Sequence, residues 1–261
     1  MRKEVIGDAT LYLGDCLELA GELPRIEALI TDPPYSSGGM VRGDRMQATA
    51  TKYINTDSKF TMREDFSGDN RDQRAFLAWA TMVFSALHRN AVPGATILAF
   101  TDWRQLPTMT DAVQCGGWVW RNLVTWWKPG VRMQRGRFSS SAEYVVYGSH
   151  GPITEGEKSP QNVLSFAPVA GEDKQHIAEK PVELLKALIG VTPAGASVTD
   201  AFMGSGTTGV ACVELGRPFV GVELDGHMFD IACRRIEQAY KQRPLFDAEP
   251  VRKPEQIGMD V

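Results

Sequence analysis

A glycine-rich turn near the carboxyl end of the chain limits the fold more than any other feature. Gly204–Gly209 reads Gly-Ser-Gly-Thr-Thr-Gly, between a predicted strand at Ala196–Asp200 and a predicted helix at Val210–Leu215. The next strand, Pro218–Val222, ends at Glu223. Bare backbone in such a turn lets a nucleotide-like cofactor come close, and a carboxylate after the next strand accepts hydrogen bonds from ribose hydroxyls. The pattern predicts a cofactor site, and by itself it fits an NAD enzyme as well as an S-adenosylmethionine enzyme.

Too little chain follows Glu223 to complete a nucleotide-binding half. Only a predicted helix, Gly226–Gln242, and a polar tail, Arg243–Val261, remain, whereas such a half needs a third strand. The first strand, Thr10–Leu13 with Asp15 just after it, could supply this third strand. We therefore predict a circularly permuted sheet whose cofactor half is divided between the two ends of the chain.

A second motif, Thr31–Tyr35 (TDPPY), follows the apolar run Ile26–Ile30. Such a run is typical of a buried strand in a parallel sheet. A prolyl nitrogen carries no hydrogen, so the Asp32 carboxylate and the Pro33 carbonyl can together accept hydrogen bonds from a planar NH2 group. Tyr35 could stack on the ring that carries this amine. The alternative is a simple strand-ending turn, because Asp-Pro is common in turns.

The rest of the chain reads as one α/β domain. Apolar spacing predicts further helices and strands, at Cys16–Leu23, Gln73–Asn90, Thr96–Phe100, Leu106–Gln114, Trp118–Trp127, Glu143–Tyr147 and Glu179–Gly190. We expect a single domain over residues 1–242, with insertions at about 36–74 and 128–175 that recognise a partner, and a tail at 243–261.

Composition excludes some classes of protein. The chain is 43% hydrophobic and 23% charged, with a net charge of -4, so it is not a generally basic nucleic-acid binder. Its four cysteines lack metal-ligand spacing, and no segment suggests a membrane span or a secretory signal, which favours a cytoplasmic protein.

One local stretch, Arg121–Arg137, is basic without any acidic residue and contains Trp126 and Trp127. We expect four of its side chains to contact phosphates, namely Lys128, Arg132, Arg135 and Arg137. The two tryptophans fit core packing at least as well as base contact.

The ordered set of motifs resembles the β-group of amino-DNA methyltransferases, the N6-adenine and N4-cytosine enzymes in which the catalytic motif precedes the cofactor motif. The resemblance rests on Gly14-Asp15, on Asp32–Tyr35 (DPPY), on His176–Pro181 (HIAEKP) and on Phe202–Thr208 (FMGSGTT). It implies an α/β, Rossmann-like fold with a permuted, mostly parallel mixed sheet and helices on both faces. It also implies S-adenosylmethionine as cofactor and double-stranded DNA, with a flipped target base, as substrate.

The resemblance assigns roles residue by residue. Catalytic roles fall to Asp32, Pro33, Pro34 and Tyr35. Cofactor-binding roles fall to Asp15, Asp32, Lys180, Asp200, Phe202, Gly204, Ser205, Gly206, Thr207 and Glu223. For Lys180-Pro181 the alternative is the start of a helix, because proline suits a first helical turn.

Several functional readings compete. Asp at the first motif position favours adenine N6 methylation, with N4-cytosine methylation as the nearest alternative. A catalytically silent DNA-binding relative is disfavoured by the intact TDPPY motif, and an NAD oxidoreductase explains neither TDPPY nor the divided cofactor half. No metal is expected. Family analogy alone suggests a homodimer and a cognate restriction nuclease as further partners.

Overall fold

The computed structural model describes residues 2–34, 71–131, 135–136, 138–169 and 179–242. Within these residues one sheet has the strand order β1-β2-β9-β8-β3-β4-β6-β5-β7. Its strands are β1 (Arg2–Ile6), β2 (Ala9–Leu13), β3 (Ile26–Thr31), β4 (Ala91–Thr101), β5 (Val119–Trp127), β6 (Ala142–Ser149), β7 (Val163–Ser165), β8 (Val198–Asp200) and β9 (Phe219–Glu223). The helices are α1 (Cys16–Leu19), α3 (Gln73–Asn90), α4 (Leu106–Cys115), α5 (Val182–Ile189), α6 (Thr207–Leu215) and α7 (Gly226–Gln242).

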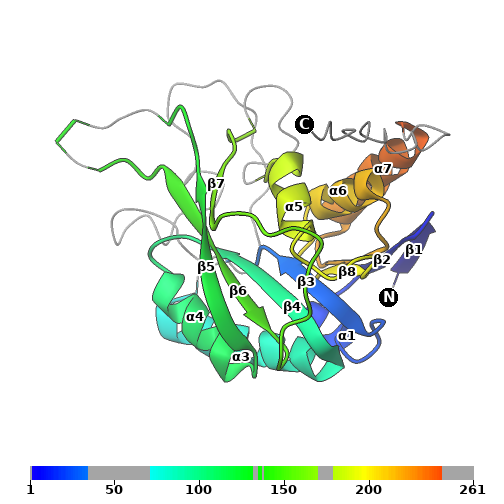
Figure 1. Ribbon diagram of the computed structural model, residues 1–261. Helices are drawn as coiled ribbons and strands as arrows, with labels where there is room; N and C mark the ends of the chain where they lie inside the picture. Colours follow the sequence, from blue (N-terminus) through cyan, green and yellow to red (C-terminus); the bar gives the residue numbers. More distant parts are fainter. Residues whose placement is uncertain (1, 35–70, 132–134, 137, 170–178, 243–261) are drawn as a thin grey trace, which may run out of the picture.

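Strands from near the two ends of the described chain pair next to the β1 edge of this sheet. β2 pairs in parallel with β9, with Leu13 opposite Glu223, and β9 continues through β8 and β3 to β4 as one parallel run. Figure 1 shows β1 and β2 beside the carboxyl-terminal helix α7. The predicted permutation is confirmed, because the first part of the chain supplies the missing neighbour of β9.

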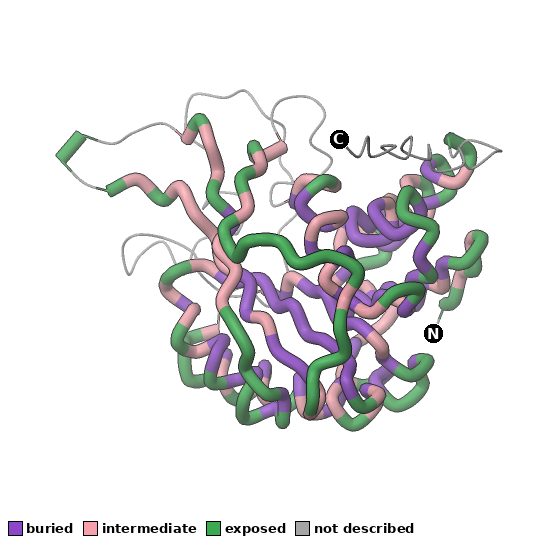
Figure 2. Tube along the Cα trace, viewed as in Figure 1, coloured by how far each residue is buried: buried purple, intermediate pink, exposed green. Residues whose placement is uncertain are grey.

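Both faces of the sheet are buried, which explains the apolar runs in its central strands. Leu29 of β3 and Ile97 of β4 belong to one core cluster, which α1, α3 and α4 also form. The next residues, Ile30 and Leu98, belong to the other cluster, which α5, α6 and α7 form. In Figure 2 the central strands are coloured mostly as buried residues. This alternation has the two-residue period of a strand and makes the predicted three-layer α/β fold.

The glycine-rich turn is shaped by two of its glycines. Gly206 has φ +83° and forms the N-cap of α6, a left-handed conformation that costs glycine little. Gly209, inside α6, has no room for a side chain, since a Cβ there would lie 2.5 Å from Ile236 Cδ1 and 2.8 Å from Phe219 Cε1. The third glycine of the motif therefore allows α6 to pack closely on β9 and α7.

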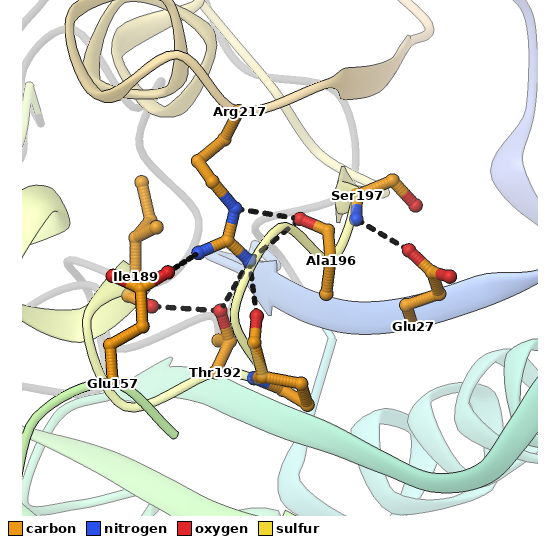
Figure 3. A network of polar contacts seen from close by, with 8 residues as sticks. Glu27, Glu157, Ile189, Thr192, Ala196, Ser197 and Arg217 are labelled. Atoms are coloured by element: carbon orange, nitrogen blue, oxygen red, sulfur yellow. Dashed lines mark hydrogen bonds and ion pairs between the residues drawn. The ribbon is translucent and has the colours of Figure 1, made fainter. Parts of the chain in front are cut away.

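A buried arginine fixes the opposite, amino edge of the same strands (Figure 3). The Arg217 guanidinium donates to the Ala196 carbonyl at 2.7 Å and 2.9 Å, and to Thr192 Oγ1 at 3.0 Å. It also pairs with Glu157 at 3.2 Å. Nearby, the Ser197 amide donates to Glu27 Oε2 at 2.6 Å. Structural hydrogen bonds thus occupy the polar groups at this edge.

The structure differs from the sequence predictions mainly at the two margins of the sheet. β1 was not predicted, although Gly7-Asp8 after it is a hairpin turn signal and Gly7 has φ +56°. β7 lies in the predicted insertion at about 128–175, and β6 and β7 make part of these residues integral to the sheet. Edge strands are short and exposed, so they lack the apolar pattern that identifies buried strands.

The predicted helix over Cys16–Leu23 is shorter in the structure and ends at Leu19. Most of the predicted insertion at about 36–74, together with the tail at 243–261, lies outside the described residues. Among the helices that the structure describes, none combines the length and the apolar character that a membrane crossing requires.

The close packing at Gly209 gives a first prediction. Gly209→Ala should lower the free energy of unfolding by about 1–3 kcal/mol, because the added methyl group overpacks the contact with the Phe219 ring. Urea denaturation measures this change. The matched control is Gly226→Ala at the start of α7, where a Cβ would meet nothing within 4 Å. It should leave stability unchanged or raise it by up to about 1 kcal/mol, and equal losses in both variants would contradict the packing argument.

Candidate active site

Acidic side chains collect where the parallel strands end. β2, β9, β8 and β3 run in the same direction, so their carboxyl ends share one edge of the sheet. Asp15, Glu223, Asp200 and Asp32 follow or end these four strands in that order. The structure therefore brings together residues from both ends of the chain, at the edge where open α/β sheets bind ligands.

Asp32 has two carboxylate oxygens in different environments. Oδ2 accepts a hydrogen bond from Lys180 Nζ at 2.6 Å. Oδ1 is buried and has no hydrogen-bond partner among the residues that the structure describes. A buried acceptor without a donor is costly, so Oδ1 is the atom of this site best prepared to accept a hydrogen bond from a ligand.

Lys180 belongs to a larger chain of charges. Its ammonium also lies 3.5 Å from Glu143 Oε2, and Glu143 Oε1 accepts a hydrogen bond from Lys128 Nζ at 2.6 Å. The Lys180 side chain is 9% exposed and that of Lys128 is 16% exposed. Lys128, which we predicted to contact phosphate, thus points its charge toward Glu143 in the structure.

For these charged side chains, burial and ion pairing shift the pKa values in opposite directions. Burial raises the pKa of Asp32, and the Lys180 charge offsets this only in part. Burial also lowers the pKa of Lys180, but the carboxylates of Asp32 and Glu143 outweigh it and raise the pKa overall. For Glu143, the two lysines overcome the effect of burial and lower the pKa. Lys180 is accordingly a permanent cation at neutral pH.

Asp200 is a structural anchor of the glycine-rich turn. Its Oδ1 accepts from Thr31 Oγ1 at 2.9 Å and from the Phe202 amide at 3.1 Å, and its Oδ2 accepts from Thr208 Oγ1 at 2.6 Å. Burial raises the pKa of Asp200 to about 6, against these three donors. The contacts link the end of β3, where TDPPY begins, to the turn that leads into α6.

Glu223 and Gly204 contact each other near Asp200, and the space beside Gly204 is open. Both Glu223 oxygens accept backbone N–H groups, Oε2 from Gly204 and Oε1 from Asp225, each at 2.8 Å. A Cβ built on Gly204 would meet nothing within 4 Å. Asp15 Oδ1 caps α1 by accepting from the Leu17 amide at 2.8 Å. The space beside the Gly204 Cα is therefore open to a ligand, next to the Glu223 carboxylate.

The hydroxyls of Ser205 and Thr207 face the protein. Arg235 on α7 donates to Ser205 Oγ at 2.7 Å and to Thr207 Oγ1 at 3.2 Å, and it pairs with Glu179 at 2.5 Å. Their side chains thus hold the turn against α7, and the predicted cofactor roles of these two residues stay predictions. Phe202 is half-buried, and its ring lies 5.6 Å from that of Trp79.

The residues predicted to contact nucleic acid are only partly described. Tyr35, Arg132 and Arg137 lie outside the described residues, and Arg135 is exposed. The two tryptophans differ: Trp126 is buried, with its indole N–H donating to the Phe166 carbonyl at 2.8 Å, and Trp127 is 48% exposed.

Sequence reasoning missed Glu143, Glu179 and Arg235. Glu143 carried a usable signal, since it is a charged residue beside the apolar run of the predicted strand Glu143–Tyr147. Such a residue at a buried end of a strand needs a partner of opposite charge. The partner of Glu179 is far away in the sequence, on α7, and no local pattern identifies it.

Comparisons with known proteins match most of the chain. A family model described as DNA methylase matches residues 26–234. The Type II methyltransferase M.Cfr9I of Citrobacter freundii is 26% identical over 273 residues, which cover 89% of this chain and 89% of that protein. The Type II methyltransferase M.HindIII of Haemophilus influenzae is 40% identical over 90 residues, which cover 34% of this chain and 29% of that protein.

Solved structures share the fold. M1.HpyAVI in complex with SAM matches with a TM-score of 0.63 and 21% identity, over 87% of this chain and 98% of that chain. The PvuII DNA methyltransferase, described as cytosine-N4-specific, matches with a TM-score of 0.65 and 18% identity, over 91% of this chain and 93% of that chain.

The buried position of Lys180 gives a second prediction. Lys180→Met should lower the free energy of unfolding by about 3–5 kcal/mol, because it leaves the Asp32 carboxylate buried without its cation. The control is Lys241→Met, which breaks the exposed ion pair with Glu237 and should change stability by at most about 1 kcal/mol. Chemical denaturation of both variants measures the difference, and a small loss for Lys180→Met would show that the pair contributes little.

Proposed function

The chain belongs to the N6/N4 family of DNA methylases, whose model spans residues 26–234, and we propose that it transfers a methyl group from S-adenosylmethionine to the N6 amine of a flipped adenine in double-stranded DNA. The observation that carries this proposal is the state of Asp32, with Oδ2 bound to Lys180 and Oδ1 buried without a described partner. The Type II methyltransferases named above support DNA modification as the setting.

An exocyclic amine is a poor nucleophile because its lone pair is conjugated with the ring. Accepting hydrogen bonds from the amine hydrogens turns the lone pair toward an electrophile and stabilises the positive charge that develops on nitrogen. Asp32 Oδ1 is suited to accept one of these hydrogens. The Pro33 carbonyl is the proposed acceptor of the other, and Tyr35 the proposed stacking partner of the extruded base.

The described residues fit S-adenosylmethionine. The cofactor carries a sulfonium and an ammonium, and the sheet edge where we place it carries the carboxylates of Asp15, Asp32, Asp200 and Glu223. The open backbone at Gly204 gives it a place of close approach, and Glu223 is the proposed acceptor for its ribose hydroxyls. When bound, the cofactor supplies an electrophilic methyl group.

The residues of the chain contribute by positioning and by electrostatics. A C5-cytosine mechanism needs a thiolate nucleophile, and Cys16, which lies next to Asp15, is buried with its pKa raised to about 12. Burial raises the pKa of the Cys212 thiol as well. Neither of these two buried thiols is therefore ionised at neutral pH.

The target base is tested by product analysis. Unmethylated genomic DNA is incubated with the protein and methyl-labelled S-adenosylmethionine, then digested to nucleosides. We expect the label in N6-methyladenine nucleoside, because Asp32 occupies the first position of the motif. Label in the N4-methylcytosine nucleoside would show that the target base is cytosine and not adenine. Absence of label on any DNA would overturn the proposed function.

A third prediction concerns Asp32→Asn. The asparagine oxygen must face the Lys180 ammonium, so its NH2 group takes the position of Oδ1 and presents a donor where an acceptor is needed. We expect kcat to fall about 100- to 1,000-fold, with binding of S-adenosylmethionine still measurable by equilibrium dialysis. The control, Asp111→Asn on the exposed side of α4, should retain full activity. An active Asp32→Asn enzyme would remove Asp32 from the role of amine acceptor.

A further inference from the structure

Four side chains of alternating charge connect Asp32 to the start of the basic segment between β5 and β6. The order is Asp32, Lys180, Glu143 and Lys128, and the successive oxygen–nitrogen distances are 2.6, 3.5 and 2.6 Å. They come from four places in the sequence: the end of β3, the residue before Pro181, the start of β6 and the end of β5. Their formal charges add to zero, which lowers the free-energy cost of removing all four from water.

Glu143 is the member that has contacts on both sides. It accepts from Lys128 through Oε1, and it faces the Lys180 ammonium through Oε2. A lysine has three rotatable donors on a flexible stem, so a single contact to Asp32 would not fix it. The second carboxylate fixes the direction from which Lys180 approaches Asp32. The Phe100 ring, 5.1 Å from the ammonium, closes another side.

We propose that Glu143 is a positioning residue for methyl transfer, which acts through Lys180 to hold the Asp32 carboxylate with one oxygen satisfied and the other available to the amine. Lys128 is the counter-cation that keeps Glu143 in place. This inference rests on the proposed function, since it assigns Asp32 the role of amine acceptor.

The pairing also places Lys128 in the protein interior, at the base of the basic segment. The Lys128 amide donates to the Ser141 carbonyl at 2.8 Å, directly after the last pair of the β5–β6 ladder. Its side chain turns inward to Glu143 while the described Arg135 is exposed. Lys128 thus differs from the phosphate-binding role that its neighbours in sequence suggest.

The charges around Asp32 make the proposal measurable through pH. Among the described residues the charged groups that act on Asp32 are Lys180, Glu143, Lys128 and Asp200. Transfer needs the Asp32 carboxylate ionised, so activity falls as the pH drops through the pKa of Asp32. Removing the Glu143 charge stabilises the ionised carboxylate and lowers that pKa, and removing the Lys128 charge raises it.

The experiment compares pH profiles of kcat for the full-length wild type, Glu143→Gln and Lys128→Met, with DNA and labelled S-adenosylmethionine. Glu143→Gln should reduce kcat about 10- to 100-fold, leave KM for S-adenosylmethionine within about twofold, and move the acidic limb to lower pH. Lys128→Met should move the same limb to higher pH. The control is Glu183→Gln on α5, the same chemical change at an exposed side chain, which should match the wild type.

Three outcomes separate the inference from the function that it assumes. An inactive wild type overturns the proposed function itself. If the wild type is active and the acidic limb of kcat is unshifted in both variants, the positioning role is overturned. This holds even where the variants are less stable, because a merely structural role would not move the pH profile of kcat. A higher KM for DNA and a weaker salt dependence in Lys128→Met, without a shift of the limb, would make Lys128 a phosphate contact instead.

Discussion

A carboxylate can have one oxygen without a hydrogen bond inside a protein only if a nearby cation balances its charge. At Asp32 this requirement determines how the charged side chains around the site are arranged. Lys180 supplies the balancing charge, with its Nζ 2.6 Å from Asp32 Oδ2. Because Lys180 is shared with Glu143, the Glu143 carboxylate needs a second cation, and Lys128 provides it. Because the balancing groups come from β5, β6 and the residue before Pro181, these elements must assemble with β3 before the charge network exists.

The sequence predicted those parts of the site that depend on backbone. Counting the strands after Gly204–Gly209 was enough to assign Thr10–Leu13 to the cofactor half as its third strand, and in the structure β2 joins that half by pairing with β9. TDPPY after an apolar run likewise placed Asp32 at the end of a buried strand. These inferences succeed because proline, glycine and apolar alternation restrict the local conformation wherever they occur.

Side-chain partners were less predictable, since they depend on which elements meet in space. Lys180-Pro181 could be a helix start or a cofactor contact in the sequence. In the structure Pro181 is indeed the N-cap of α5, and the lysine before it pairs with Asp32. Ser205 and Thr207 sit in a cofactor motif, yet their hydroxyls accept from Arg235, a residue of the last helix. Motif position located both residues in the turn, and it carried no information about the partners of their hydroxyls.

The pairing of β2 with β9 also has a consequence for synthesis of the chain. The ribosome releases β2 before β9, with β3 to β8 between them in the sequence, so β2 must wait for all of these elements before its parallel neighbour arrives. Pairings between strands so distant in sequence form slowly and leave an apolar edge exposed meanwhile. During that interval β2 has its antiparallel partner β1, which is already joined to it by the short turn at Gly7-Asp8. The β1–β2 hairpin can thus protect one edge of β2 during translation, while the half of the protein that we assign to the cofactor is completed only after β9 has been made.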